Sequence, residues 1–431
     1  MSQSAEKIPQ QRWLRIIPPA ILVYIFSFMD RTNLGIAVAG GMSESIGMTA
    51  SMAGMASGIF FFGYLLLQIP AGHLAEKGSA KKFIAITIAI WGGLSVLTGF
   101  VTEVWQLMVI RFLLGVSEGG VWPAMLVMLA HWFPPEERAR ANAFFIMNLA
   151  IACIITGPLS GWIIEQWGWR SVFFVEGVLS IALIFVWWPL IADRPENAKW
   201  ISPAERDYIT RKIQEEHAAV KSEHGPVSYK SILKDVTLWK LSYIYFGYQV
   251  GIYGFIMWLP TILKTLTKGG IAQVGYLSAL PYIIALPGLY LFGAWSDKSG
   301  DRKPYVALPA LGGAICLILS VVFKDQIWIS FGWLCAYGFF WQAYQGPFWT
   351  LPPMFFPPEV AGGARGIINA LGNMGGFVGP FAVGWIVTTW GSMDIGVYVL
   401  AFFYITATLL TYTLPTQKKR LIDHNKGQAV K

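Results

Sequence analysis

Charged residues interrupt two strongly apolar stretches of the sequence. Asp30 and Arg31 lie in one stretch, and Arg111 and Glu118 lie in another. A charge at the centre of a lipid bilayer costs at least about 2.5 to 3.5 kcal/mol, so such a residue needs a partner, a water-filled cavity or a function. A buried carboxyl beside an arginine can exchange a proton, because burial favours its neutral form and the arginine favours its charged form. An arginine keeps its charge there and offers a rigid fork of donors to a carboxylate or sulfonate.

The spacing of these residues indicates a shared site. Asp30 and Glu118 each lie near the middle of their stretches, which cross the membrane in opposite directions, so their depths coincide. Arg111 and Glu118 are seven residues apart, on one helix face and two turns from each other. We expect Asp30, Glu118 and Arg111 to couple a proton to binding, and Arg31 to bind an anion. The alternative is structural: Asp30 with Arg31 or Arg111, and Arg111 with Glu118, would be fixed ion pairs.

Four uncharged polar residues lie inside other apolar stretches, namely Tyr64, Gln249, Asn369 and Asn373. Each can hydrogen-bond a hydroxyl group, and Asn369 and Asn373 form an i, i+4 pair on one helix face. We expect them to line the same binding cavity as Arg31. The alternative is hydrogen bonding between helices, which is worth about 0.6 kcal/mol on average in membrane proteins.

Membrane-spanning helices must hold these residues in place. The chain is 55% hydrophobic and only 13% charged, whereas an average soluble domain is about 25% charged. A bilayer core about 30 Å thick needs roughly 20 apolar residues per helical span. The sequence therefore predicts an all-α integral membrane protein with twelve transmembrane helices, at residues 16–40, 52–74, 83–102, 105–131, 140–164, 171–192, 239–262, 273–295, 304–323, 327–352, 363–388 and 394–414.

The basic residues predict the orientation of these helices. The chain has a formal charge of +8, but its lysines and arginines lie mainly in the segments on one side of the predicted membrane. The loops on the other side hold only Arg170, Lys264, Lys268 and Lys324. By the positive-inside rule, both termini and the central linker are cytoplasmic. We expect a bacterial inner membrane protein that binds no nucleic acid. The three cysteines lack metal-ligand spacing, so we expect no metal and no cofactor.

An internal repeat at an offset near 222 residues divides the chain. The matching pairs of segments are 72–77 with 293–298, 133–136 with 356–359, and 162–168 with 385–391. Each repeat holds six predicted spans, an even number, so the two halves have the same orientation in the membrane. The predicted parts are a cytoplasmic segment at 1–15, six-helix bundles at 16–193 and 239–415, a cytoplasmic linker at 194–238 and a tail at 416–431. The linker is expected to contain a helix that starts at Ser202-Pro203.

The chain resembles the major facilitator superfamily, whose signature is a Gly-x-x-x-Asp-Arg-x-Gly-Arg-Arg type of loop after the second helix of each half. In this sequence Glu76 replaces the aspartate of the first copy and Lys81 and Lys82 replace arginines, while the second copy keeps Asp297. The segments 26–33, 111–119 and 173–177 resemble the anion:cation symporter family within it. Glu176 belongs to the last of these segments, but its place near a predicted helix start favours capping or packing.

The resemblance implies roles for several residues. Family members use an aspartate and a glutamate at the positions of Asp30 and Glu118 for protonation, and arginines at the positions of Arg31 and Arg111 for anion recognition and coupling. The loop motifs imply a cytoplasmic gate, in which ion pairs across the two halves close the inner side of the outward-open state. Its expected residues are Glu76, Lys82, Asp297 and Arg302.

The expected function is proton symport of a small organic anion, a sugar acid or related hydroxy carboxylate, by alternating access. The expected partners are this anion, the proton and membrane lipid, and the expected state is a monomer. Aromatic monocarboxylate symport, and exchange or uniport of an organic anion without proton coupling, remain open as alternatives. An organophosphate antiporter would need cations from both halves, and the span 239–262 has only Lys240 at its mouth. No motif of an intramembrane enzyme is present, and no appended soluble domain indicates a receptor.

Overall fold

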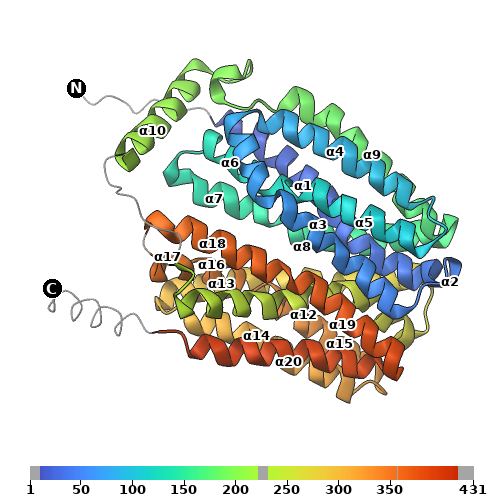
Figure 1. Ribbon diagram of the computed structural model, residues 1–431. Helices are drawn as coiled ribbons and strands as arrows, with labels where there is room; N and C mark the ends of the chain where they lie inside the picture. Colours follow the sequence, from blue (N-terminus) through green and yellow to red (C-terminus); the bar gives the residue numbers. More distant parts are fainter. Residues whose placement is uncertain (1–9, 222–231, 357, 416–431) are drawn as a thin grey trace.

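Long α-helices account for most of the chain in the computed structural model (Figure 1). The structure describes residues 10–221, 232–356 and 358–415, and within them no account is given of the side chains at 69, 72, 73, 76, 77, 135, 139, 143, 216–221, 358 and 359. The predicted tail at 416–431 and most of the predicted segment at 1–15 lie outside the described residues.

The helices form two bundles, which Figure 1 shows one above the other. The first contains α1 (Gln11–Ala37), η1 (Val38–Met42), α2 (Ser43–Ser45), α3 (Ala50–Lys77), α4 (Ala80–Thr98), α5 (Val104–Gly119), α6 (Val121–Trp132), α7 (Pro135–Ile146), α8 (Asn148–Trp167) and α9 (Trp169–Leu190). The second contains α12 (Val236–Thr267), α13 (Ile271–Ser299), α14 (Lys303–Val322), α15 (Ile327–Trp341), α16 (Gln345–Trp349), α17 (Leu351–Phe355), α18 (Pro358–Asn373), α19 (Gly375–Trp390) and α20 (Met393–Tyr412). The 3-10 turn η2 (Pro195–Asn197) and helix α10 (Pro203–Lys221) connect them.

Helix starts follow from the local sequence. Thr49, Ser79 and Ser392 each accept a hydrogen bond from a backbone N–H three residues later, and Asp235 accepts one two residues later. These side chains replace the intrahelical partners that the first N–H groups of a helix lack. Helix α10 begins at Pro203, as the sequence predicts, because proline at the first turn gives up no hydrogen bond.

Eleven helices in the described part of the chain are long and apolar enough to cross a membrane. They agree with eleven of the predicted spans, and the all-α membrane architecture is confirmed. The predicted span at 327–352 is not one continuous helix. It is divided into α15, α16 and α17, because the backbone leaves the helical region at Gln342 and prolines follow at 347 and 352.

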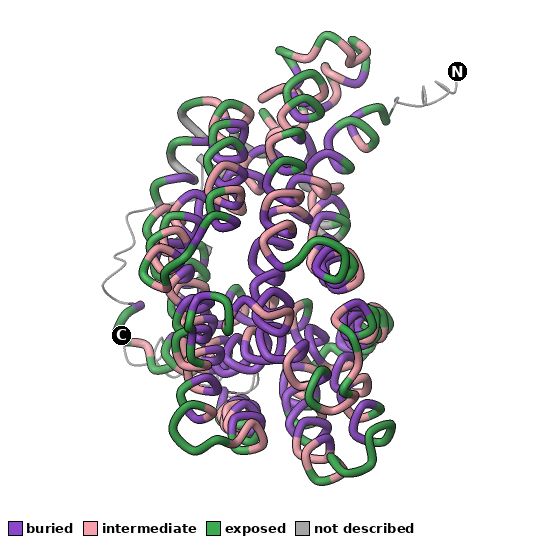
Figure 2. The backbone as a smooth tube through the Cα atoms, turned by 90° about the vertical axis from the view of Figure 1, so that its right-hand side faces the viewer, coloured by how far each residue is buried: buried purple, intermediate pink, exposed green. Residues whose placement is uncertain are grey.

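Figure 2 looks along the bundles and shows buried backbone concentrated between them and on their inner faces, with exposed residues outside. We call the end that carries α10 the linker end and the opposite end, with the loops at Gly47, Gly168 and Gly391, the far end (Figure 1).

The two bundles are in close contact in the far-end half of the molecule. A Cβ atom placed on Gly54 of α3 would lie 2.3 Å from the carbonyl oxygen of Pro380 in α19. A Cβ on Gly157 of α8 would lie 2.6 Å from the carbonyl oxygen of Gly275 in α13. Lys264 donates a hydrogen bond to the carbonyl oxygen of Ala39 in the π-helical turn of the first bundle. Backbones can approach this closely only because the contact positions are glycines.

A buried charge cluster attaches α10 to the linker end of the first bundle. Glu205 is fully buried and accepts hydrogen bonds from the Arg12 side chain, at 2.6 Å, and from the backbone N–H groups of Gln11 and Arg12. Arg12 also donates to both oxygens of Glu137 in α7, at 2.6 and 2.7 Å. Trp200 stacks on Trp132 nearby, with ring centroids 5.0 Å apart. One arginine thus joins the start of α1, the start of α7 and the linker.

We expect Glu205→Ala to lower the midpoint of thermal unfolding of the purified protein by at least about 5 °C. Leaving a buried charge without its partner costs about 3 to 5 kcal/mol, and each kcal/mol moves the midpoint of a bundle of this size by about 2 to 4 °C. The matched control is Glu215→Ala on the same helix, whose side chain is 58% exposed. Equal midpoints for the two variants would contradict the structural role of the cluster.

Candidate functional site

Five ionisable side chains are buried together in the middle of the first bundle. The exposed fractions are 2% for Asp30, 7% for Arg31, 2% for Arg111, 0% for Glu118 and 1% for Glu176. Helix α1 contributes the first two, α5 the next two and α9 the last. Four of them are the residues that the sequence places at the membrane centre.

Arg31 and Glu118 form an ion pair between α1 and α5. Arg31 Nε donates to Glu118 Oε2 at 3.0 Å, and Ser27 Oγ donates to the same oxygen at 2.8 Å. The other carboxyl oxygen, Glu118 Oε1, is buried without a hydrogen-bond partner. Glu118 therefore has one anchored oxygen and one free oxygen. The ion-pair partner of Glu118 is therefore Arg31. The sequence had suggested Arg111 as a partner, because it lies on the same helix face.

The Arg31 guanidinium lies in an aromatic box. Its carbon atom is 4.6 Å from the ring centroid of Tyr64 and 5.1 Å from that of Phe60, with Tyr24 and Phe28 slightly further away. Tyr253 of α12, in the second bundle, lies close to the Arg31 side chain. Arg31 NH2 is buried and has no hydrogen-bond partner. A cation held by one nitrogen, with another nitrogen free, can bind an anion.

Asp30 is held by neutral donors. Ser95 Oγ of α4 donates to Asp30 Oδ1 at 2.8 Å, and Asn33 Nδ2 donates to the same oxygen at 3.2 Å. Asp30 Oδ2 is buried without a partner. Arg111 donates to the backbone carbonyl oxygen of Asp30 at 2.7 Å and to that of Ala56 at 3.3 Å. These two hydrogen bonds link α5 to α1 and α3 through backbone groups.

Glu176 belongs to the same network, although we expected capping or packing from the sequence. Ser160 Oγ donates to Glu176 Oε1 at 2.7 Å, and Asn33 Nδ2 donates to Glu176 Oε2 at 2.9 Å. Helix α9 begins at Trp169, so Glu176 lies two turns into it and not at its edge. Two features of the sequence could have indicated this network. Glu176 is a carboxyl inside an apolar helix, and Asn33 lies three residues after Asp30, on the same face of its helix.

Uncharged polar side chains form a separate hydrogen-bonded group in the second bundle. Gln249 Nε2 of α12 donates to Asn373 Oδ1 of α18 at 3.2 Å, and the Tyr344 hydroxyl donates to Gln249 Oε1 at 3.3 Å. Tyr344 also stacks on Tyr248, with ring centroids 3.6 Å apart. Gln249 and Asn373 therefore lie together. Asn369 is separate from them, because it donates to Gln68 Oε1 of α3 at 3.2 Å.

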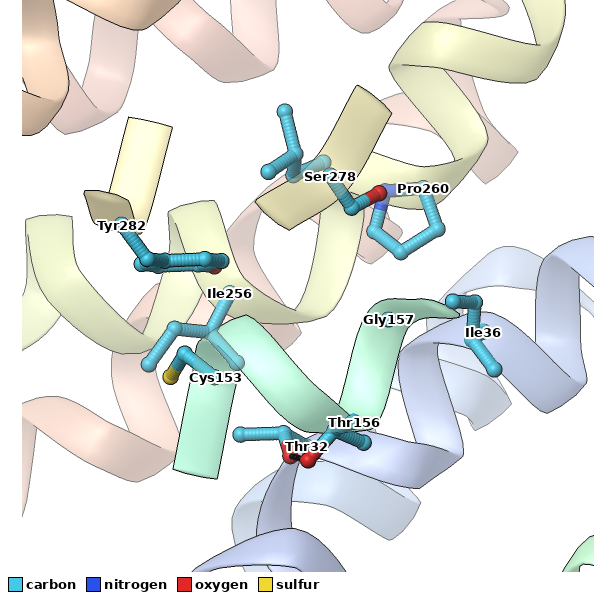
Figure 3. A pocket seen from close by; sticks show the side chains of 10 residues that line it. Thr32, Ile36, Cys153, Thr156, Gly157, Ile256, Pro260, Ser278 and Tyr282 are labelled. Carbon is cyan, nitrogen blue, oxygen red and sulfur yellow. Dashed lines mark hydrogen bonds between the residues drawn. The ribbon is translucent and has the colours of Figure 1, made fainter. Parts of the chain in front are cut away.

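A small cavity of about 20 Å³ lies between the bundles (Figure 3). Thr32, Thr156 and Cys153 line it from the first bundle, and Ser278 and Tyr282 line it from the second. The Thr32 and Thr156 hydroxyls hydrogen-bond each other at 3.1 Å. Gly157, one of the glycines at the contact between the bundles, also lines the cavity.

The expected gate residues lie at the linker end. Arg302 pairs with Asp297 at 2.5 Å, within one loop motif and not between the two halves. Lys82 is exposed in the first turn of α4, where its backbone N–H is capped by Ser79. The side chain of Glu76 lies outside the described part of the chain.

This arrangement can bind an anion and hold protons. Arg31 supplies a positive charge with a free donor, and Asp30 and Glu118 each have a buried oxygen that no hydrogen bond occupies. Protonation of either carboxyl removes a charge that is costly to bury. In the described part of the chain, no group of three or more His, Cys, Asp or Glu residues is arranged to hold a metal ion.

Comparisons with known proteins give relatives over nearly the whole chain. The family model described as Major Facilitator Superfamily matches residues 20–380. A protein named as a tartrate transporter in Agrobacterium vitis is 34% identical, with 93% of each chain covered. A quinolone resistance transporter of Acinetobacter baumannii is 28% identical, with 94% of each chain covered. The crystal structure of a bacterial homolog of the human lysosomal transporter Spinster has the same fold, with a TM-score of 0.75 at 18% identity, covering 94% of this chain and 97% of that one.

Proposed function

The chain belongs to the Major Facilitator Superfamily, and from this premise we propose that it imports a small organic anion by proton symport with alternating access. It is a multi-pass membrane transporter and not an enzyme. The anion that we propose is a sugar acid or a related hydroxy carboxylate. The membrane is the bacterial inner membrane, with the linker end and both termini on the cytoplasmic side.

The proposal of an anion as substrate rests on the NH2 group of Arg31, which is buried and has no hydrogen-bond partner. A guanidinium with a buried, unpartnered NH2 group is an unsatisfied donor, and a substrate carboxylate is a strong acceptor for it. The aromatic box fixes the position of the guanidinium and keeps it from water, which strengthens its attraction for an anion. The box also has Tyr253 of the second bundle beside it, so a bound anion would contact both halves.

Proton coupling follows from competition for Arg31. Glu118 and a substrate carboxylate are both anions that need the same guanidinium. When Glu118 takes up a proton, it releases its hold on Arg31 and the substrate can bind there. When the substrate leaves, Glu118 loses its proton and pairs with Arg31 again. Asp30, buried among neutral donors, is the second proton site.

The polar groups opposite Arg31 favour a hydroxylated acid. Gln249, Asn373 and Tyr344 offer amide and phenol groups to hydroxyls at a distance from the carboxylate. The relative named for tartrate transport supports a hydroxy acid as well. A second candidate is an aromatic monocarboxylate, which the stacked rings of Tyr248 and Tyr344, with Phe348 edge-on to Tyr344, favour.

The state described here is proposed to be inward-facing. The bundles touch through backbone at Gly54 and Gly157, both in the far-end half. If the linker end is cytoplasmic, this contact closes the extracellular side. Uptake would begin from the opposite state, in which these contacts are broken and the anion and proton enter from outside.

The test measures the pH outside lightly buffered, de-energised cells or proteoliposomes after addition of candidate substrates. The panel contains sugar acids, small hydroxy mono- and dicarboxylates, aromatic carboxylates including a quinolone, and sugar phosphates. We expect the medium to become alkaline with one class of hydroxy acid. In Glu118→Gln this alkalinisation should vanish while exchange of labelled substrate continues, because glutamine keeps the hydrogen-bonding shape of the site but cannot carry the proton.

The matched control is Glu165→Gln, an exposed carboxyl on α8, which should behave as the unchanged protein. Substrate uptake without any pH change would support a uniporter or exchanger and would make Asp30 and Glu118 structural. Alkalinisation only with aromatic acids would support the second candidate. No uptake of any anion in the panel would refute the proposed function.

A further inference from the structure

Three carboxyls and two guanidiniums share the buried centre of the first bundle. Arg31 and Arg111 are the cations, and Asp30, Glu118 and Glu176 are the acids. If all five were ionised, the centre would carry an uncompensated negative charge away from water. A buried carboxylate without a cationic partner is strongly unfavourable, and such a group takes up a proton instead.

The hydrogen bonds indicate where this proton resides. Glu118 is paired with Arg31, so its charge is compensated. Asp30 receives hydrogen bonds from Ser95 and Asn33, and Glu176 receives them from Ser160 and Asn33, all of which are neutral. The shared proton therefore belongs to Asp30 or to Glu176.

Asn33 joins these two acids directly. Its Nδ2 atom donates to Asp30 Oδ1 at 3.2 Å and to Glu176 Oε2 at 2.9 Å. Its Oδ1 atom is buried without a partner, as is Asp30 Oδ2. The amide nitrogen has two hydrogens, so it can donate to both acids at once, and the proton of the neutral acid can lie on a carboxyl oxygen that Asn33 does not contact.

We propose that Asp30 and Glu176 hold one proton between them across Asn33, so that Glu176 sets the pH at which Asp30 is loaded during transport. This inference rests on the proposed function, in which Asp30 is a proton site. Glu176 acts through Asp30 and need not touch the substrate. The ionised form of either acid favours the protonated form of the other, because their charges repel at short range in an apolar interior.

Few other charged groups surround this pair. Arg31 lies beside Asp30 on α1, and Arg111 and Glu118 face Asp30 from α5. Toward Glu176, α8 contributes the Ser160 hydroxyl, and α4 contributes Ser95 to the Asp30 side. Helix α4 packs on α9 through Gly92 and Gly177, where a Cβ would lie within 3.0 Å of the opposing backbone. Among the residues described, the charge nearest to Glu176 along the hydrogen bonds is thus Asp30.

The test compares the unchanged protein with Glu176→Gln and, as control, Glu165→Gln. The first readout is the pH midpoint of anion-driven proton uptake into proteoliposomes, with the substrate found in the panel. Loss of the repelling neighbour makes Asp30 easier to ionise, so a more acidic medium is needed to load it. We expect the midpoint in Glu176→Gln to move to lower pH by about one unit, and that in Glu165→Gln to stay.

The second readout needs no transport. Infrared difference spectra of the purified protein, recorded across a pH titration, report the C=O band of protonated carboxylic acids. We expect a buried acid band whose titration changes in Glu176→Gln and also in Asn33→Ala, which cuts the connection and keeps both acids. An unchanged midpoint and an unchanged band titration in both variants would overturn the inference. If the unchanged protein moves no protons, the proposed function fails, and the infrared titration still decides whether the two acids share one proton.

Discussion

Replacing Arg31 by lysine should lower the uptake rate at limiting substrate concentration by at least about thirtyfold. Lysine keeps the positive charge but loses the planar fork that donates to Glu118 through Nε while leaving NH2 free for a ligand. Disrupting one member of a buried, hydrogen-bonded charge pair costs about 2 to 5 kcal/mol, and about 1.4 kcal/mol corresponds to a factor of ten. The flexible ammonium cannot satisfy Glu118 and the substrate together.

The measurement is initial uptake of labelled substrate, with direct binding to the purified protein alongside. Arg170→Lys is the matched control, since Arg170 lies at the far end and donates to Ser45 and to the Val101 carbonyl oxygen. We expect Arg31→Lys to lose binding as well as uptake. Normal binding with lost uptake would mean that Arg31 couples the proton and does not hold the anion.

Replacing Gly54 by valine should hold the transporter open at the far end. The new Cβ would lie 2.3 Å from the Pro380 carbonyl oxygen and 2.9 Å from the Cα atom of Phe381, so the contact between α3 and α19 could not form. Overpacking of this kind costs about 1 to 3 kcal/mol, which moves an equilibrium between two states by about 5- to 150-fold. Uptake should fall by a comparable factor, because closure of the far end is one step of each cycle.

The native Cys153 provides the readout for this change. It is buried in the cavity between the bundles and is one of three cysteines in the chain. With Cys316 and Cys335 replaced by serine, we expect Gly54→Val to increase the labelling of Cys153 by a membrane-impermeant maleimide added to intact cells. Gly93→Val is the control, since a Cβ there has no neighbour within 4 Å. Lower labelling in Gly54→Val than in the control would contradict an inward-facing assignment of this structure.

Much of the fold could be predicted from the sequence, because the main signals are local in the chain. Apolar stretches long enough to cross a bilayer predict eleven helices that the structure contains. The prediction of one continuous helix at 327–352 was wrong. Periodicity and hydrophobicity do not reveal that the helix ends at Trp341 and that another starts at Gln345. The prolines at 347 and 352 were the available warning.

The central residues could also be identified, but their partners could not. Asp30, Arg31, Arg111 and Glu118 were recognisable because a charge in an apolar helix is rare. Which arginine pairs with Glu118 depends on how far α1 and α5 are rotated about their axes, and spacing along one helix does not contain that information. The same reason explains Asn369, which contacts Gln68 of the other bundle rather than the Gln249 and Asn373 pair.

Glu176 was set aside for a related reason. Its depth was judged from the edge of an apolar stretch, and the helix starts two residues earlier than the stretch suggested. No rule applied to a single sequence indicates that Asn33 reaches across from α1 to bond it. Tyr253 carried no signal either, since a tyrosine in an apolar helix is ordinary.

The unequal chemistry of the two bundles has a consequence for how such a transporter can evolve. Among the residues that the structure describes, the buried charges at the centre belong to the first bundle, whereas α12 has no charged residue between Leu241 and Leu263 and carries Gln249 and several tyrosines there. Mutations in the second bundle can therefore change which substrates fit the site without changing the charged residues of the first bundle. If the proposed proton coupling resides in the first bundle, a lineage with this division could acquire new substrates through substitutions among uncharged residues of the second bundle, while the coupling residues stay the same.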